Sequence, residues 1–180
     1  MGSEMCIRDR CRLAQRAQGL PGQDGRPATQ KPRISQTIEA VSWPLDSDVL
    51  SQPAKKAGNV RVIAWLEEHK DECYTSSIVI AQLAFWVRSK RAKQRIALQK
   101  WLTDLIDALH SRILGFNASV AHVRAEQQHQ LQTAGKPMPV EDSCIAAIAR
   151  RHHLTVVTGN VKDFQRPGIK VFNPFDELDT

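Results

Sequence analysis

The fold is decided by residues 154–164, which have the sequence LTVVTGNVKDF. The β-branched residues at its start favour a strand that ends at Thr158. Gly159 and Asn160 predict a turn, and a short helical segment is expected near Asp163. This stretch therefore places polar side chains directly after the end of a strand.

Strands and helices alternate on both sides of this stretch. Apolar periodicity, helix caps such as Asn59 and Asn117, and the helix-ending Gly135 define the segments. We expect strands at residues 41–45, 73–77, 112–116, 154–158 and 169–172, and helices at residues 59–70, 78–89, 98–109, 117–134 and 141–152. Short strands that alternate with helices predict an α/β fold with a parallel sheet of four to five short strands flanked by helices.

Several apolar positions are expected to be buried. The segment 78–89 is apolar almost all round, which is typical of a deeply packed helix. Cys73 and Cys144 lie in apolar stretches and are expected to be small buried residues. The chain has four cysteines but no C-x-x-C pair, so we expect neither a cysteine metal site nor a disulfide framework.

Composition narrows the class of protein. In 180 residues, 42% hydrophobic and 24% charged residues are ordinary for a globular domain with a core. No apolar run is long enough to span a bilayer, and the N-terminus lacks the apolar segment of a secretory signal. We therefore expect a cytoplasmic protein that does not bind a membrane.

Positive charge is concentrated in one local run. The net charge is +6, but residues 41–180 have eighteen Lys and Arg against fifteen Asp and Glu, which is weak evidence for a nucleic-acid partner. Six basic residues crowd the segment from Arg88 to Lys100. Such a run is usually the solvated face of a helix, and the alternative is a surface that guides a nucleic-acid backbone.

Residues 1–40 differ from the rest in being rich in Gln, Arg, Gly and Pro without sustained periodicity. This composition predicts a disordered extension. The opening EMCIRDR, residues 4–10, also resembles the translation of a transposon end used in sequencing libraries, so an artefactual origin is the alternative. The folded domain is expected at residues 42–176.

Acidic side chains fall where the strands of such a sheet end. Asp46 and Asp48 follow the first predicted strand, and Asp142 lies in the first turn of a helix. Asn160 and Asp163 follow the strand 154–158. In open parallel α/β sheets, ligands bind outside the carboxyl ends of the strands.

Each of these acids alone has an ordinary explanation as a turn residue, a helix-start residue or a surface charge. Gathered at one edge of a sheet, they would repel one another unless a cation neutralised them. The hard ions Mg²⁺ and Mn²⁺ take oxygen ligands and leave positions for phosphate. A divalent metal site at this edge is therefore one interpretation of the pattern.

Four segments resemble the VapC-type PIN domains of toxin–antitoxin pairs. Residues 45–51 (LDSDVLS) resemble the family's LDTNVLS opening, and residues 139–147 (PVEDSCIAA) resemble its P-x-x-D-x-x-I-A-A helix start. Residues 154–164 resemble LTLVTRNVKDF, and residues 171–175 (VFNPF) resemble the closing V-x-NPW/F. The resemblance covers roughly 135 residues in the correct order.

This resemblance implies a PIN-like parallel sheet and RNA hydrolysis that depends on Mg²⁺ or Mn²⁺. It also implies a homodimer, and inhibition by a cognate antitoxin whose tail occupies the active site. By position, Asp46, Asp142 and Asp163 would be the acidic metal residues, and Asn160 would support them, with Thr158 nearby. The bound ions would then activate a water molecule and stabilise charge on the phosphate.

The sequence departs from the family pattern at several positions. The family's glutamate early in the helix after the second strand is Gln82 here. Its LDTN asparagine is Asp48, and the glutamate common after LS is Gln52. Pro44 is unusual for the first strand. A glutamine keeps a carbonyl ligand but loses the charge, so we expect the affinity for a metal ion to fall.

Two other functions fit parts of this pattern. A degenerate PIN domain would bind RNA or an antitoxin without cutting RNA, and Gln82 favours it. A phosphoacceptor receiver domain also gathers acids after its first strand. It needs a third-strand aspartate and a lysine at the end of the fifth strand, and neither can be placed here. The metal-dependent endoribonuclease is the interpretation that we prefer.

Overall fold

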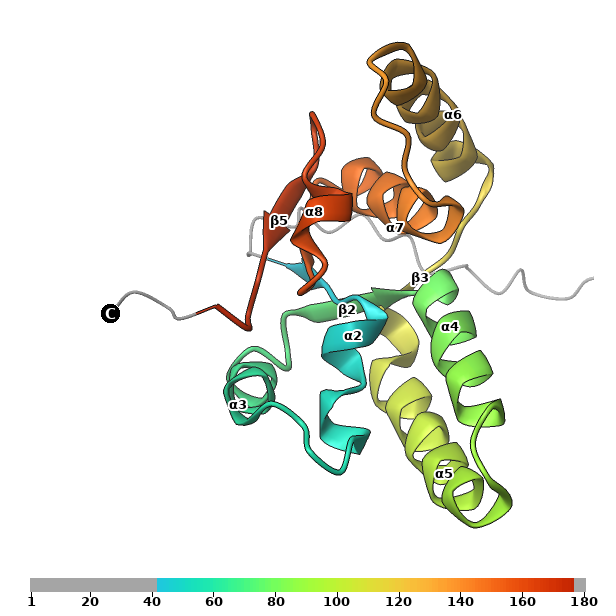
Figure 1. The fold of residues 1–180 in the computed structure, drawn as a ribbon, viewed down its shortest axis with the longest axis vertical. Coiled ribbons are helices and arrows are strands. Elements are labelled where there is room, and N and C mark those ends of the chain that lie inside the picture. The colour runs from blue at the N-terminus through green and yellow to red at the C-terminus, as the bar shows by residue number, and fades with distance from the viewer. Residues whose placement is uncertain (1–41, 177–180) are drawn as a thin grey trace, which may run out of the picture. The chain divides into compact units, whose positions relative to one another are not determined.

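The computed structural model describes residues 42–176, and the expectations for residues 1–40 lie outside this range. Within the described part, five short strands alternate with helices (Figure 1). The strands are β1 (Trp43–Pro44), β2 (Cys73–Ser76), β3 (Ile113–Leu114), β4 (Thr155–Val157) and β5 (Lys170–Phe172). The predicted α/β class is confirmed, although each of the five strands is shorter than its predicted range.

Two helices begin at the predicted caps Asn59 and Asn117, whereas the helix predicted at residues 98–109 begins earlier, at Ala92. They are α2 (Ser47–Leu50), α3 (Val60–Glu68), α4 (Ser77–Arg88), α5 (Ala92–Leu109), α6 (Ala118–Thr133), α7 (Val140–Arg151) and α8 (Val161–Phe164), with 3-10 turns at Gln52–Ala54 and His110–Arg112. The Asn59 side chain accepts hydrogen bonds from the backbone N–H groups of Arg61 and Val62, and that of Asn117 accepts one from Val120. These bonds satisfy helix N–H groups that lack partners within the helix.

All strand pairs are parallel. β1 pairs with β2 and β2 with β3, while β4 pairs with β5. A single bridge between Leu45 and Val157 joins the two sheets, so the strand order is β3-β2-β1-β4-β5. The chain proceeds outward from β1 in one direction and from β4 in the other. The boundary between β1 and β4 is therefore the point where ligands bind in such folds.

This order also bears on the receiver-domain alternative. In flavodoxin-like sheets, to which receiver domains belong, β1 lies between β2 and β3. Here β1 lies between β2 and β4. The receiver interpretation is therefore wrong.

Pro44 accounts for the weak junction between the two sheets. The flanking residues Trp43 and Leu45 donate their N–H groups to Glu72 and Tyr74 on the β2 side. The nitrogen of Pro44 therefore lies on the β4 side, where proline has no N–H to donate. The first N–H that reaches β4 is that of Asp46, which donates to the Val157 carbonyl at 3.0 Å.

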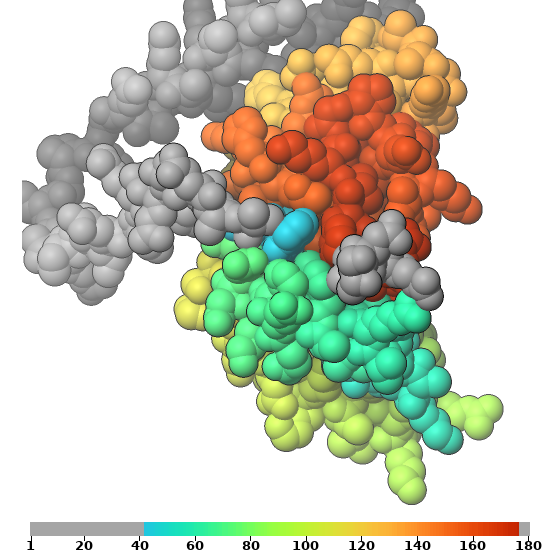
Figure 2. All heavy atoms as spheres, turned by 90° about the vertical axis from the view of Figure 1, so that its left-hand side faces the viewer, coloured from blue at the N-terminus to red at the C-terminus, as the bar shows by residue number. Residues whose placement is uncertain are grey.

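Aromatic rings close one side of this junction. The ring of Trp43 lies 5.7 Å from that of Trp65 on α3 and 5.4 Å from that of Phe172 on β5, centroid to centroid. Figure 2 shows the start of β1, in blue, between the red C-terminal segment and the green residues of α3 and β2. Burying aromatic rings removes large apolar areas from water, so this cluster stabilises the contact between the sheets.

Two burial predictions are wrong and one is confirmed. α4 is not packed all round, because the Phe85 side chain is 76% exposed. Its buried stripe consists of Val79, Leu83 and Val87, which face α5, α7 and the sheet. Cys144 is half-buried rather than buried, whereas Cys73 is buried as expected. None of the helices in residues 42–176 is long and apolar enough to cross a membrane.

Candidate active site

Asp46 lies at the junction between β1 and β4 and caps the N-terminus of α2. Its side chain is buried, and its Oδ1 accepts the backbone N–H of Ser47 at 2.6 Å. Its Oδ2 accepts the hydroxyl of Thr158 at 2.9 Å. Burial first, and then the negative charge of Asp48, raises the pKa of Asp46, while these hydrogen bonds act in the opposite direction. The fold thus holds one carboxylate at the switch point of the sheet.

Thr158 starts a continuous chain of hydrogen bonds. Its Oγ1 donates to Asp46 and accepts the backbone N–H of Asn160 at 3.0 Å. The Asn160 Nδ2 then donates to the Asp163 Oδ2 at 2.8 Å. Asp46 and Asp163, which are far apart in the sequence, are therefore linked through two polar side chains from the turn after β4.

Asp48 ties the loop after β1 to the turn after β4. Its Oδ2 accepts the backbone N–H of Gly159 at 2.8 Å. The turn is tight at Gly159, because a Cβ there would lie 3.0 Å from Asp48 Oδ2 and 2.9 Å from Cδ2 of Phe175, so that these side chains would have to shift. The other carboxylate oxygen, Asp48 Oδ1, is buried and has no hydrogen-bond partner among the described residues.

Asp142 lies in the first turn of α7 and carries the clearest electrostatic signal. Burial raises its pKa to about 6, and the charges of Asp46, Asp163, Glu141 and Asp48 add to the effect. Such coupling requires that these carboxylates lie near one another in a poorly solvated region. The negative charges of Asp46, Asp48 and Asp163 therefore act on Asp142 and disfavour its ionised form.

Gln82, which lies on α4, is a neighbour of Asp48. Its Oε1 is buried and has no hydrogen-bond partner within residues 42–176, as is also true of Asp48 Oδ1. Both residues line a cavity of about 220 Å³. Two buried acceptors without donors at one cavity indicate a place that suits a cation or a ligand with N–H or O–H groups.

The oxygen atoms at this site are of the chemical type that a hard divalent ion prefers as ligands. Every donor is a carboxylate or amide oxygen, which Mg²⁺ and Mn²⁺ prefer, and such ions keep several waters rather than a full set of protein ligands. Among residues 42–176, no three His, Cys, Asp or Glu side chains form a metal-holding group by themselves.

Sequence reasoning missed three features of the site. It did not foresee the close approach at Gly159, which depends on Phe175 from a distant segment. It also missed Lys55 and Trp86, which line the 220 Å³ cavity with Gln82. The positive charge of Lys55 lowers the pKa of Asp48, against the larger effect of burial. A lone lysine and one tryptophan in an apolar helix gave no sequence signal of this proximity.

Comparisons with known proteins agree with this architecture. Residues 45–170 match the model of the PIN domain family. The chain is 32% identical to Toxin FitB of Neisseria gonorrhoeae over 136 residues, which is 74% of this chain and 98% of that protein. It is 31% identical to VapC ribonuclease Y4jK of Sinorhizobium fredii over 135 residues, which is 73% of this chain and 96% of that protein.

A solved structure gives the same result at the level of the fold. The crystal structure of FitAcB from Neisseria gonorrhoeae aligns with a TM-score of 0.71 and 33% identity, and the alignment covers 75% of this chain and 99% of that chain. The family-model match, residues 45–170, includes all the segments that supply the carboxylates. The chain therefore belongs to the PIN-domain family, among the toxins of the VapC and FitB type.

Proposed function

We propose that this chain is a metal-dependent endoribonuclease of the VapC toxin type, which hydrolyses phosphodiester bonds in RNA. The observation that supports this most directly is the excess of negative charge at the β1–β4 switch point. There the pKa of Asp142 rises to about 6 through burial and through Asp46, Asp163, Glu141 and Asp48. A site that concentrates buried carboxylates destabilises itself unless a cation joins it.

Asp46 and Asp142 would be the principal ligands of Mg²⁺ or Mn²⁺, and Asp163 would bind or orient a second position. When bound, the ion supplies an activated water and stabilises the charge that develops on the phosphate. Thr158 holds Asp46 in one orientation through its 2.9 Å hydrogen bond. Asn160 does the same for Asp163 at 2.8 Å, which leaves one oxygen of that carboxylate available.

Basic residues of α4 and α5 would guide the RNA backbone. This basic run, from Arg88 to Lys100, starts near the 220 Å³ cavity. Trp86 lines that cavity, and the Lys90 Nζ lies 4.8 Å from the centroid of the Trp86 ring. Arg91, Lys93 and Arg95 continue it as exposed side chains at the start of α5. Contacts from such residues to phosphates are independent of sequence and weaken with salt.

A cognate antitoxin and a second copy of the chain are the protein partners that we propose. Large apolar side chains remain exposed on the described surface, at Phe85 (76%), Val140 (64%) and Ile96 (74%). Exposed apolar residues of this size favour protein interfaces when they gather in patches. Association with an antitoxin would keep the nuclease inactive in the cytoplasm, where the RNA substrate is found.

A catalytically degenerate module that binds RNA or an antitoxin is the second candidate. Gln82 favours it, because its amide oxygen occupies a buried position without the charge that a glutamate would bring. An amide oxygen is a weaker ligand for a hard cation than a carboxylate oxygen. The module would keep the fold and the basic surface and lose only the hydrolysis.

The test is cleavage of a single-stranded RNA by the full chain with Mg²⁺, with Mn²⁺ and with EDTA. We expect cleavage that EDTA abolishes and that Asp46→Asn or Asp142→Asn reduces by about 100-fold or more, as for loss of a group that stabilises charge in the transition state. Asp107→Asn, at an exposed position on α5, is the matched control and should leave the rate unchanged. Cleavage that persists in EDTA or in both site variants would contradict the proposal.

A further inference from the structure

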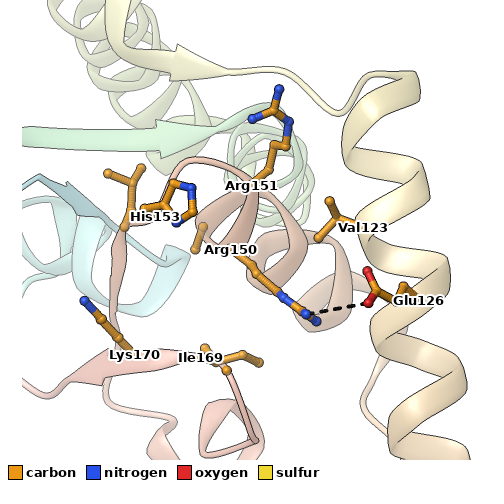
Figure 3. A pocket seen from close by; sticks show the side chains of 10 residues that line it. Val123, Glu126, Arg150, Arg151, His153, Ile169 and Lys170 are labelled. Atoms are coloured by element: carbon orange, nitrogen blue, oxygen red, sulfur yellow. Dashed lines mark ion pairs between the residues drawn. The ribbon is translucent and has the colours of Figure 1, made fainter. Parts of the chain in front are cut away.

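A second cavity, of about 410 Å³, lies at the other ends of β4 and β5. The carboxylate cluster follows the carboxyl end of β4, whereas this cavity is lined by residues that precede β4 and β5, such as Leu154 and Ile169. Val123 of α6 lines the opposite wall (Figure 3). These three side chains form an apolar part of the cavity lining. The volume of the cavity is typical of small-molecule sites.

The rim of this cavity is strongly basic. Arg150 and Arg151 at the end of α7, His153 and Lys170 all line it, against a single acid, Glu126 (Figure 3). The Arg150 Nη2 lies 3.9 Å from the Glu126 Oε1, at the outer limit of an ion pair. Glu126 therefore neutralises at most one of the three full positive charges.

One nitrogen atom of these cations lacks a hydrogen-bond partner within residues 42–176. The Arg150 Nη1 is buried and donates no hydrogen bond within the described residues. A charged donor that is removed from water without an acceptor is costly, so such groups in folded proteins usually face a ligand.

The turns that frame the rim have an unusual backbone. His153 has a φ of 59°, which is uncommon for a residue other than glycine, and Gly168 has a φ of 79°. A Cβ on Gly168 would meet only the Arg150 guanidinium, at 3.9 Å. Gly168 therefore lies beside the Arg150 side chain at the edge of the cavity.

We propose that this cavity binds a nucleoside monophosphate unit, with the phosphate among the basic side chains of the rim and the nucleoside against the apolar part of the lining. Guanidinium and ammonium groups bind phosphate oxygens through charge-assisted hydrogen bonds. A phosphate monoester, with up to two negative charges, matches the excess of cations better than a single carboxylate. The site lies apart from the carboxylate cluster, so the proposal does not depend on catalysis.

The experiment measures binding of adenosine 5′-monophosphate to the full chain in EDTA, which keeps metal-mediated binding at the carboxylates out of the measurement. Inorganic phosphate and adenosine are the comparison probes. We expect saturable binding that is tighter than that of either fragment. Lys170→Glu, at an exposed position, and Arg150→Met, which keeps the aliphatic stem, should each weaken it by about tenfold or more.

Lys136→Glu, which makes the same charge change at an exposed position in the loop after α6, is the matched control and should bind as the wild type does. A short RNA with a 5′-phosphate distinguishes the two sources of the ligand. Lys170→Glu weakens binding of this RNA if the cavity takes the 5′ end of an RNA strand. It leaves RNA binding unchanged if the cavity takes free nucleotides, and either result is compatible with the proposal. No saturation by the nucleotide, equal binding of inorganic phosphate, or unchanged binding by both cavity variants would overturn it. Capture of an acidic peptide in place of the nucleotide would also overturn it and assign the surface to a protein partner.

Discussion

The hydroxyl of Thr158 donates to the Asp46 carboxylate across 2.9 Å and so connects the residue after β4 with the residue after β1. Both side chains are buried, and only one backbone bridge joins the two sheets at this point. The bond therefore does two things. It orients a candidate metal ligand, and it reinforces the junction that Pro44 leaves short of a donor.

Replacing Thr158 with valine tests this bond. Thr158→Val keeps the shape but leaves the Asp46 Oδ2 without its donor, so the free energy of unfolding should fall by about 1–3 kcal/mol. Thr158→Ser should restore most of the loss, because it keeps the hydroxyl. Urea unfolding measures the effect. The control is Thr103→Val on α5, whose hydroxyl bonds only the Gln99 carbonyl at the surface. An equal loss in both valine variants would contradict a special role for Thr158.

The tight turn after β4 predicts a contrast between two glycines. Gly159→Ala would put a Cβ 2.9 Å from the Phe175 ring and 3.0 Å from Asp48 Oδ2. Overpacking of this kind costs about 1–3 kcal/mol. Gly115→Ala meets nothing within 4 Å, so it should be neutral or slightly stabilising. Thermal unfolding compares the two. Equal unfolding midpoints for the two variants would show that the turn accommodates a Cβ at position 159 without loss of stability.

The raised pKa of Asp142 predicts how stability depends on pH. The folded state holds its proton up to about pH 6, whereas the ordinary value is 3.8. The folded state therefore binds more protons in this window, and the contribution of Asp142 to stability falls as the pH rises from about 4 to about 6. Because the side chain is partly solvated, the penalty at neutral pH should be about 1 kcal/mol.

The measurement is urea unfolding in EDTA as a function of pH. Asp142→Asn should be more stable than the wild type at pH 7, with the difference vanishing near pH 4, while Asp107→Asn should follow the wild type throughout. Added Mn²⁺ should stabilise the wild type more than Asp142→Asn, since a ligand stabilises the state that binds it. A difference that does not change between pH 4 and pH 7 would show that Asp142 is not electrostatically coupled in the folded protein.

Local sequence patterns predicted the helices and strands. The features that these patterns did not predict depend on contacts between residues far apart in the sequence. The turn Thr158–Asp163 was evident because β-branched residues, glycine and asparagine encode it within a few positions. The need for glycine at position 159 was not, because it arises from Asp48 and Phe175. The exposure of Phe85 was missed for a similar reason. Composition indicates an apolar helix, but only the packing determines which face stays uncovered.

The position at Gln82 decides between the two proposed functions. Its amide oxygen is buried without a partner beside the equally unpartnered Asp48 Oδ1. We expect the wild type to cleave RNA weakly with Mg²⁺, and better with Mn²⁺, which tolerates less ideal ligand sets. Gln82→Glu should raise Mg²⁺-dependent cleavage, because a carboxylate neutralises the ion and binds it better than an amide oxygen does.

Initial rates on one RNA, with each metal, measure this effect, and Gln128→Glu at an exposed position on α6 is the control for the added charge. Strong Mg²⁺-dependent cleavage by the wild type that Gln82→Glu leaves unchanged would mean that Asp48 already supplies the missing charge. If neither protein cleaves RNA while both bind it equally well, the chain is the degenerate binding module, since a restored carboxylate at this position should rescue a site whose only defect is Gln82.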